Sequence, residues 1–378
     1  MIFEPLDKIV SELAGQIGKP DDQMKMLLIF FFAYPIGYGY RFIRGKWMRH
    51  AYSIILGVFL HLFMFKEEAI HFWALDVVVY LILTFIDRKR QAWVVFITCM
   101  AHLSLLHIRR VIFDYGGWSM DATTFLMPLV SRLSSLGFVY ADGRRMIEQE
   151  KNKTKSDLKD TRELSDDQKE RLVKDKPTLI EIFSYTSYPA ANMCGPFFEF
   201  RDYIDFIEEN DRYKNIPQSF QRSFKKLFQG LFFLVLCIGI PFIIDVREIV
   251  TIEFYELPYY YQLLKFMAAL IAVRTTYYVA WYINDGSITL SGLSYNGKDS
   301  NGIEKFDRIN CADALGVELC TSPRDGIKNW NSQTAEWLRH YLYNRLVAKK
   351  YNNTSATLLT NLGSAFWHGF YPVYYQTF

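Results

Sequence analysis

His368 is the residue whose surroundings most strongly indicate chemistry. It lies in the stretch LGSAFWHGFYP, between small residues and aromatic ones, near the end of a chain of 378 residues. An ionisable side chain in an apolar segment is costly, so such residues usually face a cavity or the interior of a helical bundle. An imidazole also titrates near neutrality, which suits a general base. We therefore predict that His368 is catalytic. For the histidines within other apolar segments, such as His107, packing or a hydrogen bond to a neighbouring helix is the expected role.

Three further stretches contain residues that could act with His368. In KNWNSQTAEWLRHYLY, the residues Trp330, Thr334, Trp337 and Tyr341 recur every three or four positions, which predicts one face of a helix. Asn331 stands at the start of that helix, and residue type alone favours a helix N-cap there.

The other two stretches are a Gly-Pro break and an aromatic segment. Gly195-Pro196 interrupts any helix and predicts a turn or a re-entrant bend. In RTTYYVAWYINDG, Asp285 closes an aromatic helix and could equally be an ordinary loop carboxylate.

Several classes of function find no support. The five cysteines show no Cys-x-x-Cys spacing, so no metal site is predicted. Hydrolase elbows, phosphate-binding loops, dinucleotide fingerprints and zinc-protease motifs are missing. The net charge of +3, without a stripe of basic and aromatic residues, gives no reason to expect a nucleic-acid partner.

The elements that must position these residues are membrane-length helices. Charged residues cluster into short loops and one long run, and a bilayer core of about 30 Å needs roughly 20 mostly apolar residues. We predict an all-α polytopic bundle, because a barrel would need short alternating segments that are absent. The expected spans are 26–43, 51–65, 69–86, 92–113, 123–140, 227–244 and 259–283. Three weaker segments, expected as re-entrant or short interior helices, are 177–200, 334–347 and 357–378.

Loop charges predict the orientation of this bundle. Basic residues follow the first span and the third, so these loops are expected in the cytosol and the N-terminus on the other side. Residues 1–25 resemble no signal peptide and form an N-terminal lead-in. Residues 26–378 are predicted to form one membrane domain, in which 142–176 is a charged cytosolic loop, either a solvated helix or disordered.

Taken together, ordered blocks of this sequence resemble the MBOAT (membrane-bound O-acyltransferase) family, in particular its lysophospholipid acyltransferase branch. The Trp330-Asn331 and Trp367-His368-Gly369 blocks are the most specific. Weaker blocks run in the same order: Asp121 to Gly143, Gly195-Pro196 to Phe206, and Tyr277 to Gly286.

The resemblance implies a site and substrates. The family's asparagine and histidine fall on Asn331 and His368, and the residues expected to contact substrate are Trp330, Trp337, Trp367, Tyr278 and Asp285. The branch often has glutamate where this chain has Asp285. Acyl-CoA is expected as co-substrate and a lysophospholipid as acceptor, with no cofactor, in the bilayer of the endoplasmic reticulum; oligomeric state is not predicted. The chain ends soon after His368 and is expected to lack the family's last spans.

Acyl transfer suits these residues. A base must take the proton of the acceptor hydroxyl, and a donor must stabilise the developing oxyanion; the thioester is already activated. Asn331 would orient the imidazole or the thioester carbonyl. Four cations could meet the phosphates of coenzyme A, although solvated or snorkelling charges are the favoured interpretation: Arg274, Lys298, Arg324 and Lys328.

Three alternatives stay open. The acceptor could be a sterol, a diacylglycerol or a protein. The chain could be a transporter or channel with His368 and Asp285 on a polar path, although the first five spans are expected to bury almost no charge and no paired broken helices suggest inverted repeats. It could also be an inactive, short relative.

Overall fold

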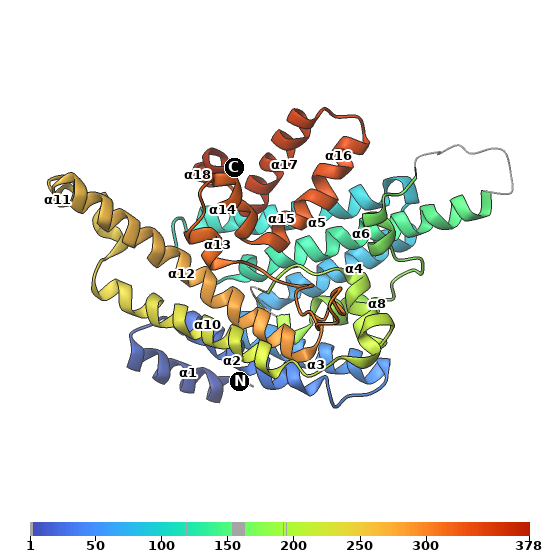
Figure 1. Cartoon of the computed structure of the whole chain (residues 1–378), viewed down its shortest axis with the longest axis horizontal. Coiled ribbons are helices and arrows are strands. Elements are labelled where there is room, and N and C mark those ends of the chain that lie inside the picture. The colour runs from blue at the N-terminus through green and yellow to red at the C-terminus, as the bar shows by residue number, and fades with distance from the viewer. Residues whose placement is uncertain (1–2, 118, 153–162, 192, 194) are drawn as a thin grey trace.

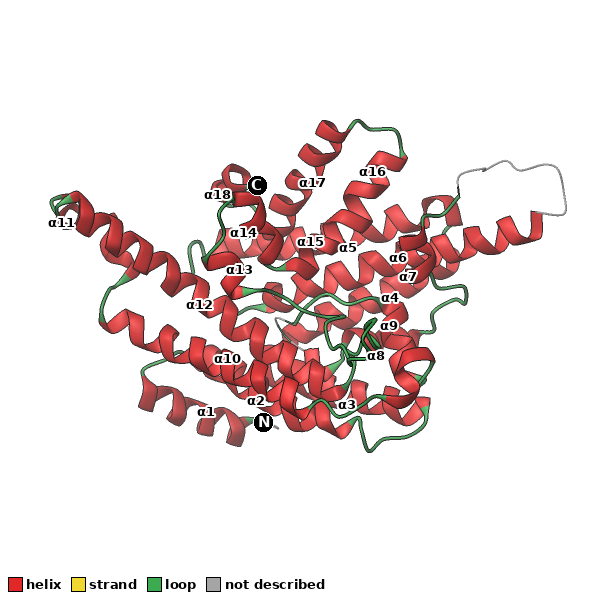
Figure 2. Cartoon of the chain, in the orientation of Figure 1, coloured by secondary structure: helices red, strands yellow, loops and turns green. Residues whose placement is uncertain are grey.

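The computed structural model describes residues 3–117, 119–152, 163–191, 193 and 195–378. Helices dominate throughout, and between these residues the only β-type pairing is an isolated bridge of Lys298 with Glu304 (Figure 2). Five stretches are long and apolar enough to cross a membrane: Lys46–Phe85, Arg88–Phe113, Ala122–Lys151, Phe220–Phe242 and Tyr259–Ser291. The predicted all-α membrane bundle is therefore confirmed.

The described residues contain eighteen α-helices, numbered in chain order, and Figure 1 labels most of them. The first half contains α1 (Glu4–Ile17), α2 (Asp21–Gly39), α3 (Lys46–Phe65), α4 (Ile70–Phe85), α5 (Arg88–Phe113), α6 (Ala122–Asn152), α7 (Asp166–Arg171), α8 (Leu179–Thr186) and α9 (Phe200–Ile207). The second half contains α10 (Phe220–Gly239), α11 (Ile252–Tyr255), α12 (Tyr259–Ser291), α13 (Ala314–Glu318), α14 (Pro323–Asn329), α15 (Ser332–Leu338), α16 (Asn344–Ala348), α17 (Asn353–His368) and α18 (Pro372–Thr377).

Most predicted spans correspond to one helix each. The segments 51–65 and 69–86 become α3 and α4, separated by a 3-10 turn (Lys66–Ala69) in which Lys66 has a φ of 50°. The segment 26–43 becomes α2, which is not among the five membrane-length stretches. Its first turn is polar, so its apolar run is shorter than the roughly 20 residues that a bilayer requires.

The weaker segment 177–200 lies inside the bundle. It forms α8 and a short 3-10 turn (Pro189–Ala191), and residues 195–199 lead to α9 as non-helical backbone. Arg132 of α6 holds this stretch: its Nη2 donates to the carbonyls of Ala191 at 2.9 Å and Pro196 at 3.1 Å. The guanidinium also lies 4.5 Å from the centre of the Phe198 ring. These bonds satisfy irregular backbone that lipid could not.

The expectation of almost no buried charge in the first five spans was wrong. Arg132 is fully buried, and Asp76 of α4 is 1% exposed. Backbone carbonyls bind the first, and the Thr186 hydroxyl donates to the second at 2.8 Å. Both partners come from the 186–196 stretch, so these charges anchor the interior segment rather than lining an open path.

Helix α6 runs parallel to the segment from α15 to α16, in a fixed register. The indole Nε1 of Trp337 donates to Ser134 Oγ at 3.0 Å, and one turn later the rings of Tyr341 and Phe138 lie 5.9 Å apart. Another turn on, Arg345 binds both carboxylate oxygens of Asp142 at 2.8 and 2.6 Å. A π-turn (Arg339–Tyr343) lies in the middle of this contact. The weak segment 334–347 is thereby fixed against the most buried of the five spans.

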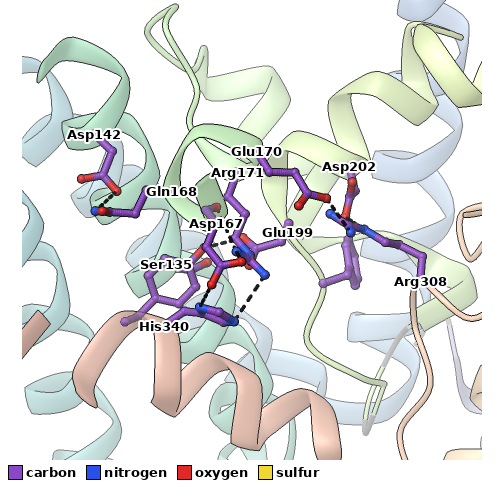
Figure 3. Close-up of polar contacts among 12 residues, drawn as sticks. Ser135, Asp142, Asp167, Gln168, Glu170, Arg171, Glu199, Asp202, Arg308 and His340 are labelled. Carbon is purple, nitrogen blue, oxygen red and sulfur yellow. Dashed lines mark hydrogen bonds and ion pairs between the residues drawn. The ribbon is translucent and has the colours of Figure 1, made fainter. Parts of the chain in front are cut away.

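Two parts of the predicted charged loop 142–176 are described, residues 142–152 and 163–176. Residues up to Asn152 continue α6, and 163–176 fold back onto the bundle, where Leu172 is buried. Figure 3 shows Arg171 of α7 beside Glu199 and His340, with Nε 3.1 Å from Glu199 Oε1. Composition alone could not predict these ion pairs, because the paired residues are distant in sequence. Residues 153–162 of the predicted loop lie outside the described part of the chain.

Candidate functional site

His368 is the last residue of α17 and is half-buried among aromatic rings. Its ring stacks on Phe378, with centres 4.9 Å apart, and lies 5.6 Å from Tyr374 of α18. Trp367, next to it, donates its indole N–H to the Met127 carbonyl of α6 at 3.0 Å. Trp367 is also 5.7 Å from Trp337, ring centre to ring centre. Packing of these two tryptophans brings α17 against α15.

Asn331 occupies the N-cap position of α15, but its side chain makes no capping hydrogen bond. Its backbone is left-handed, with φ 42° and ψ 52°, a conformation that asparagine tolerates better than most residues. The next residue is held firmly, since the Ser332 N–H donates to the Cys311 carbonyl at 2.8 Å. The sequence therefore predicted the position correctly, whereas the amide does not perform the capping that usually accompanies it.

Trp330 belongs to a second aromatic group, on α12. Its ring centre lies 4.7 Å from Trp281 and 5.8 Å from Tyr278. The predicted helical face was wrong in this respect: Trp330 has extended backbone after α14, and only from Ser332 does α15 begin. Trp330 therefore contacts α12, while Trp337 and Tyr341 pack on α6.

Asp285 lies inside α12 instead of closing it. The helix continues to Ser291, and Asp285 is 2% exposed. Its Oδ2 accepts from the Cys311 N–H at 2.9 Å and lies 3.4 Å from Lys226 Nζ. Its Oδ1 has no hydrogen-bond partner. Asp285 thus holds the Cys311 backbone, which in turn accepts a hydrogen bond from the Ser332 N–H next to Asn331.

The predicted site residues therefore form two groups joined by Asn331. Tyr278, Asp285 and Trp330 belong to the α12 side, while Trp337, Trp367 and His368 belong to the side of α6 and α17. Asn331 precedes the helix α15, whose other end carries Trp337, and the Trp337 ring lies 5.7 Å from that of Trp367, the neighbour of His368. No direct hydrogen bond joins Asn331 to His368.

A pocket of about 470 Å³ opens beside the Asp285 loop. Arg222, Lys225 and Lys226 of α10 line it together with Asn310, whose side-chain oxygen accepts from Lys226 Nζ at 3.3 Å. Glu304, also in the lining, accepts from the Tyr295 hydroxyl at 2.5 Å, and this bond lowers the pKa of Glu304. Sequence reasoning missed the α10 cations; their i, i+3, i+4 spacing on one face was the available signal.

The four cations selected from sequence as possible phosphate ligands are either paired with carboxylates or lie outside this pocket. Arg274 binds Glu318 through two bonds of 2.7 and 2.6 Å, and Lys298 lies 3.3 Å from Glu304. Burial alone would raise the pKa of Glu318, but the hydrogen bond from Arg274 holds it below its usual value. Arg324 and Lys328 are exposed on α14, outside this pocket.

A second pocket, of about 550 Å³, lies at the other end of the α15–α16 segment. Arg171, His340 and Arg345 line it together with acidic residues of α6 and α7. These charges bind one another: Arg345 pairs with Asp142, and Arg171 lies between Glu199 and His340 (Figure 3). This polar network closes the bundle around Tyr341, whose hydroxyl donates to Glu199 at 2.6 Å.

The chain is similar in sequence to members of one known family. Residues 81–378 match the sequence model of MBOAT, the membrane-bound O-acyltransferase family. Lysophospholipid acyltransferase 6 of Drosophila melanogaster is 29% identical over 88% of this chain and 46% of its own length. The lysophospholipid acyltransferase of Schizosaccharomyces pombe is 30% identical over 96% of this chain and 70% of its own length. Human membrane-bound glycerophospholipid O-acyltransferase 2 is 28% identical over 98% of this chain. The chain thus spans about half of the first relative and 70% and 72% of the other two.

Proposed function

Because the chain belongs to the membrane-bound O-acyltransferase family, we propose that it moves a fatty acyl group from acyl-CoA to the free sn-2 hydroxyl of a lysophospholipid. The names of three relatives, all acyltransferases of lysophospholipids or glycerophospholipids, support this reaction. The observation that carries it is the packing of Trp367, the neighbour of His368, on Trp337 of α15, with ring centres 5.7 Å apart and both indole N–H groups bonded to α6. We further propose the endoplasmic reticulum as its membrane.

In this reaction His368 is the base and Asn331 the polar partner. The imidazole takes the proton of the acceptor hydroxyl as its oxygen attacks the thioester carbonyl. The C–S bond then breaks, and the imidazolium returns the proton to the thiolate of coenzyme A. The Asn331 amide, which caps no helix, is available to donate to the oxyanion that develops on the carbonyl. This chemistry requires neither a metal nor a covalent enzyme intermediate.

The donor's phosphates would bind at the pocket beside Asp285. Arg222, Lys225 and Lys226 face it from one helix, and it borders the loop that holds Ser332 next to Asn331. Lys225 is exposed, so its substitution should leave the fold intact. We expect Lys225→Ala to weaken acyl-CoA binding by about 1 kcal/mol, a roughly fivefold increase in KM that shrinks at high salt. Lys8→Ala, on α1, is the matched control; an equal KM in both variants would rule out this pocket.

The decisive experiment measures acyl transfer by the purified chain in nanodiscs. One labelled acyl-CoA is offered with lysophospholipids of several head groups, a sterol and a diacylglycerol. We expect transfer to lysophospholipid, and a loss of about 10²- to 10⁴-fold in His368→Ala. Transfer only to sterol or diacylglycerol would overturn the acceptor, and wild-type turnover in His368→Ala would overturn the base.

A further inference from the structure

His107 of α5 contacts the backbone on both sides of His368. Its Nε2 lies 3.1 Å from the Trp367 carbonyl oxygen and donates a hydrogen bond to it. Its ring also lies against Gly369. His107 is 7% exposed and comes from a helix 260 residues away in sequence. We propose that His107 is a positioning residue, which fixes the last turn of α17 so that the His368 imidazole is held in its reactive place.

The hydrogen bond from His107 satisfies a carbonyl group at the end of α17 that has no partner within the helix. The last four carbonyls of an α-helix have no intrahelical partner, and α17 ends at His368. The Gly369 N–H donates to the Ala365 and Phe366 carbonyls, at 3.1 and 3.2 Å. The Trp367 carbonyl receives its donor from His107 instead. The helix end that carries His368 is therefore tied to α5.

The contact with Gly369 fixes the other side. Gly369 has φ 120° and ψ −156°, a backbone region that glycine alone adopts readily. A Cβ at this position would lie 3.2 Å from His107 Nδ1, and its three nearest neighbours would all be atoms of the His107 ring. The imidazole thus packs where the chain turns away from His368, and it limits how far this turn can relax.

If His107 only supports the fold, its substitution should have a different effect than if it positions His368. Loss of packing alone lowers stability, whereas misplacement of a base by about 1 Å can cost about 10²-fold in rate without weakening binding. Leucine keeps much of the volume but cannot donate, and glutamine can place an amide N–H near the Nε2 position. His102→Leu is the matched control, because His102 lies on the same helix and its ring faces His71, 5.4 Å away.

The test compares kcat, KM and melting temperature of the full chain in nanodiscs for wild type, His107→Leu, His107→Gln and His102→Leu. We expect His107→Leu to lower kcat about 10²-fold with little change in either KM, and His107→Gln to recover most of the loss. His102→Leu should keep wild-type kcat. Unchanged kcat in His107→Leu would overturn the proposal. A fall in kcat that parallels a fall in melting temperature, and that His107→Gln does not recover, would also overturn it.

The kinetic test rests on the proposed acyl transfer. A second readout is therefore chosen that does not depend on that activity. Carbethoxylation of His368 by diethyl pyrocarbonate, followed by peptide mass spectrometry, reports how firmly that ring is held. We expect faster modification in His107→Leu and a near wild-type rate in His107→Gln. Equal rates in all variants would overturn the role of His107. Absence of transfer by the wild type, with these differences present, would overturn the function alone.

Discussion

At the residue scale, the proposed site departs from local rules at the positions to which we assign function. Asn331 has the helix-start position but not the capping bond, and its φ of 42° stores backbone strain. Local rules are commonly broken where function demands it. His368 could be recognised from its neighbours in sequence. For His107 the sequence predicted packing or a hydrogen bond to a neighbouring helix, but not which partner, because the Trp367 carbonyl is 260 residues away.

The left-handed backbone of Asn331 allows its side chain to be tested alone. Asn331→Gly removes the amide and suits the positive φ, so the fold should be retained. If the amide donates to the oxyanion, kcat should fall about 10²- to 10³-fold. Steady-state kinetics and a melting curve measure the two effects separately.

Lys350→Gly is the matched control for this substitution. Lys350 also has a positive φ, of 69°, and lies in the exposed turn after α16. It should keep wild-type kcat and melt at the same temperature or slightly higher. A kcat of Asn331→Gly equal to that of Lys350→Gly would remove Asn331 from the mechanism.

At the element scale, helix existence followed from the sequence better than helix partnership. Apolar runs predicted that α5, α10 and α12 exist, because hydrophobic length is a local property, although the expected segment 227–244 starts seven residues inside α10 (Phe220–Gly239). The end of α12 was missed, since Asn284, Asp285 and Gly286 read as a loop. They remain helical because the Cys311 loop and α10 supply partners for Asp285. The parallel register of α6 with α15 and α16 depends on such distant pairs, and one sequence does not reveal them.

The Asp142–Arg345 pair fixes the far end of that register. Both side chains are largely buried, so removing one partner leaves a charge that neither water nor protein neutralises. We expect Asp142→Leu or Arg345→Met alone to cost about 3–5 kcal/mol, and the double variant to recover most of it. Thermal melting in nanodiscs, with both singles and the double, gives the coupling energy. Additive losses would show that the pair does not hold the two segments together.

At the scale of the whole molecule, the spans differ in burial far more than in hydropathy. The window of α6 is 83% buried, whereas that of the stretch Phe220–Phe242 is 11% buried. Their mean hydropathies are 1.3 and 1.6. Helix α6 is therefore central, whereas α10 packs along α12, which also packs on α2 (Figure 1). Apolar residues suit both lipid and a protein core, so hydropathy predicted membrane insertion but not the position of each helix.

The orientation of the molecule in its membrane follows from the two ends of α5. This helix has 26 residues, which at about 1.5 Å each crosses a core of roughly 30 Å. The basic residues before it place that end in the cytosol by the positive-inside rule. Lys89 and Tyr115 are both exposed, on opposite sides of the span. Cysteines at these two positions should therefore react from opposite faces of a sealed vesicle.

Labelling of introduced cysteines in microsomes tests this orientation. In a Cys320→Ser background, which removes the one exposed thiol among the described cysteines, a membrane-impermeant maleimide should label Lys89→Cys in intact vesicles. Tyr115→Cys should react only after permeabilisation. Because His368 and His107 share the Tyr115 end of α5, the same result would place His368, the proposed base, near the luminal face. The acyl chain of the proposed donor, acyl-CoA, would then have to reach across the bundle from the cytosolic side to meet it. Labelling of both positions in intact vesicles would refute α5 as a span, and the opposite pattern would invert the molecule and place His368 at the cytosolic face.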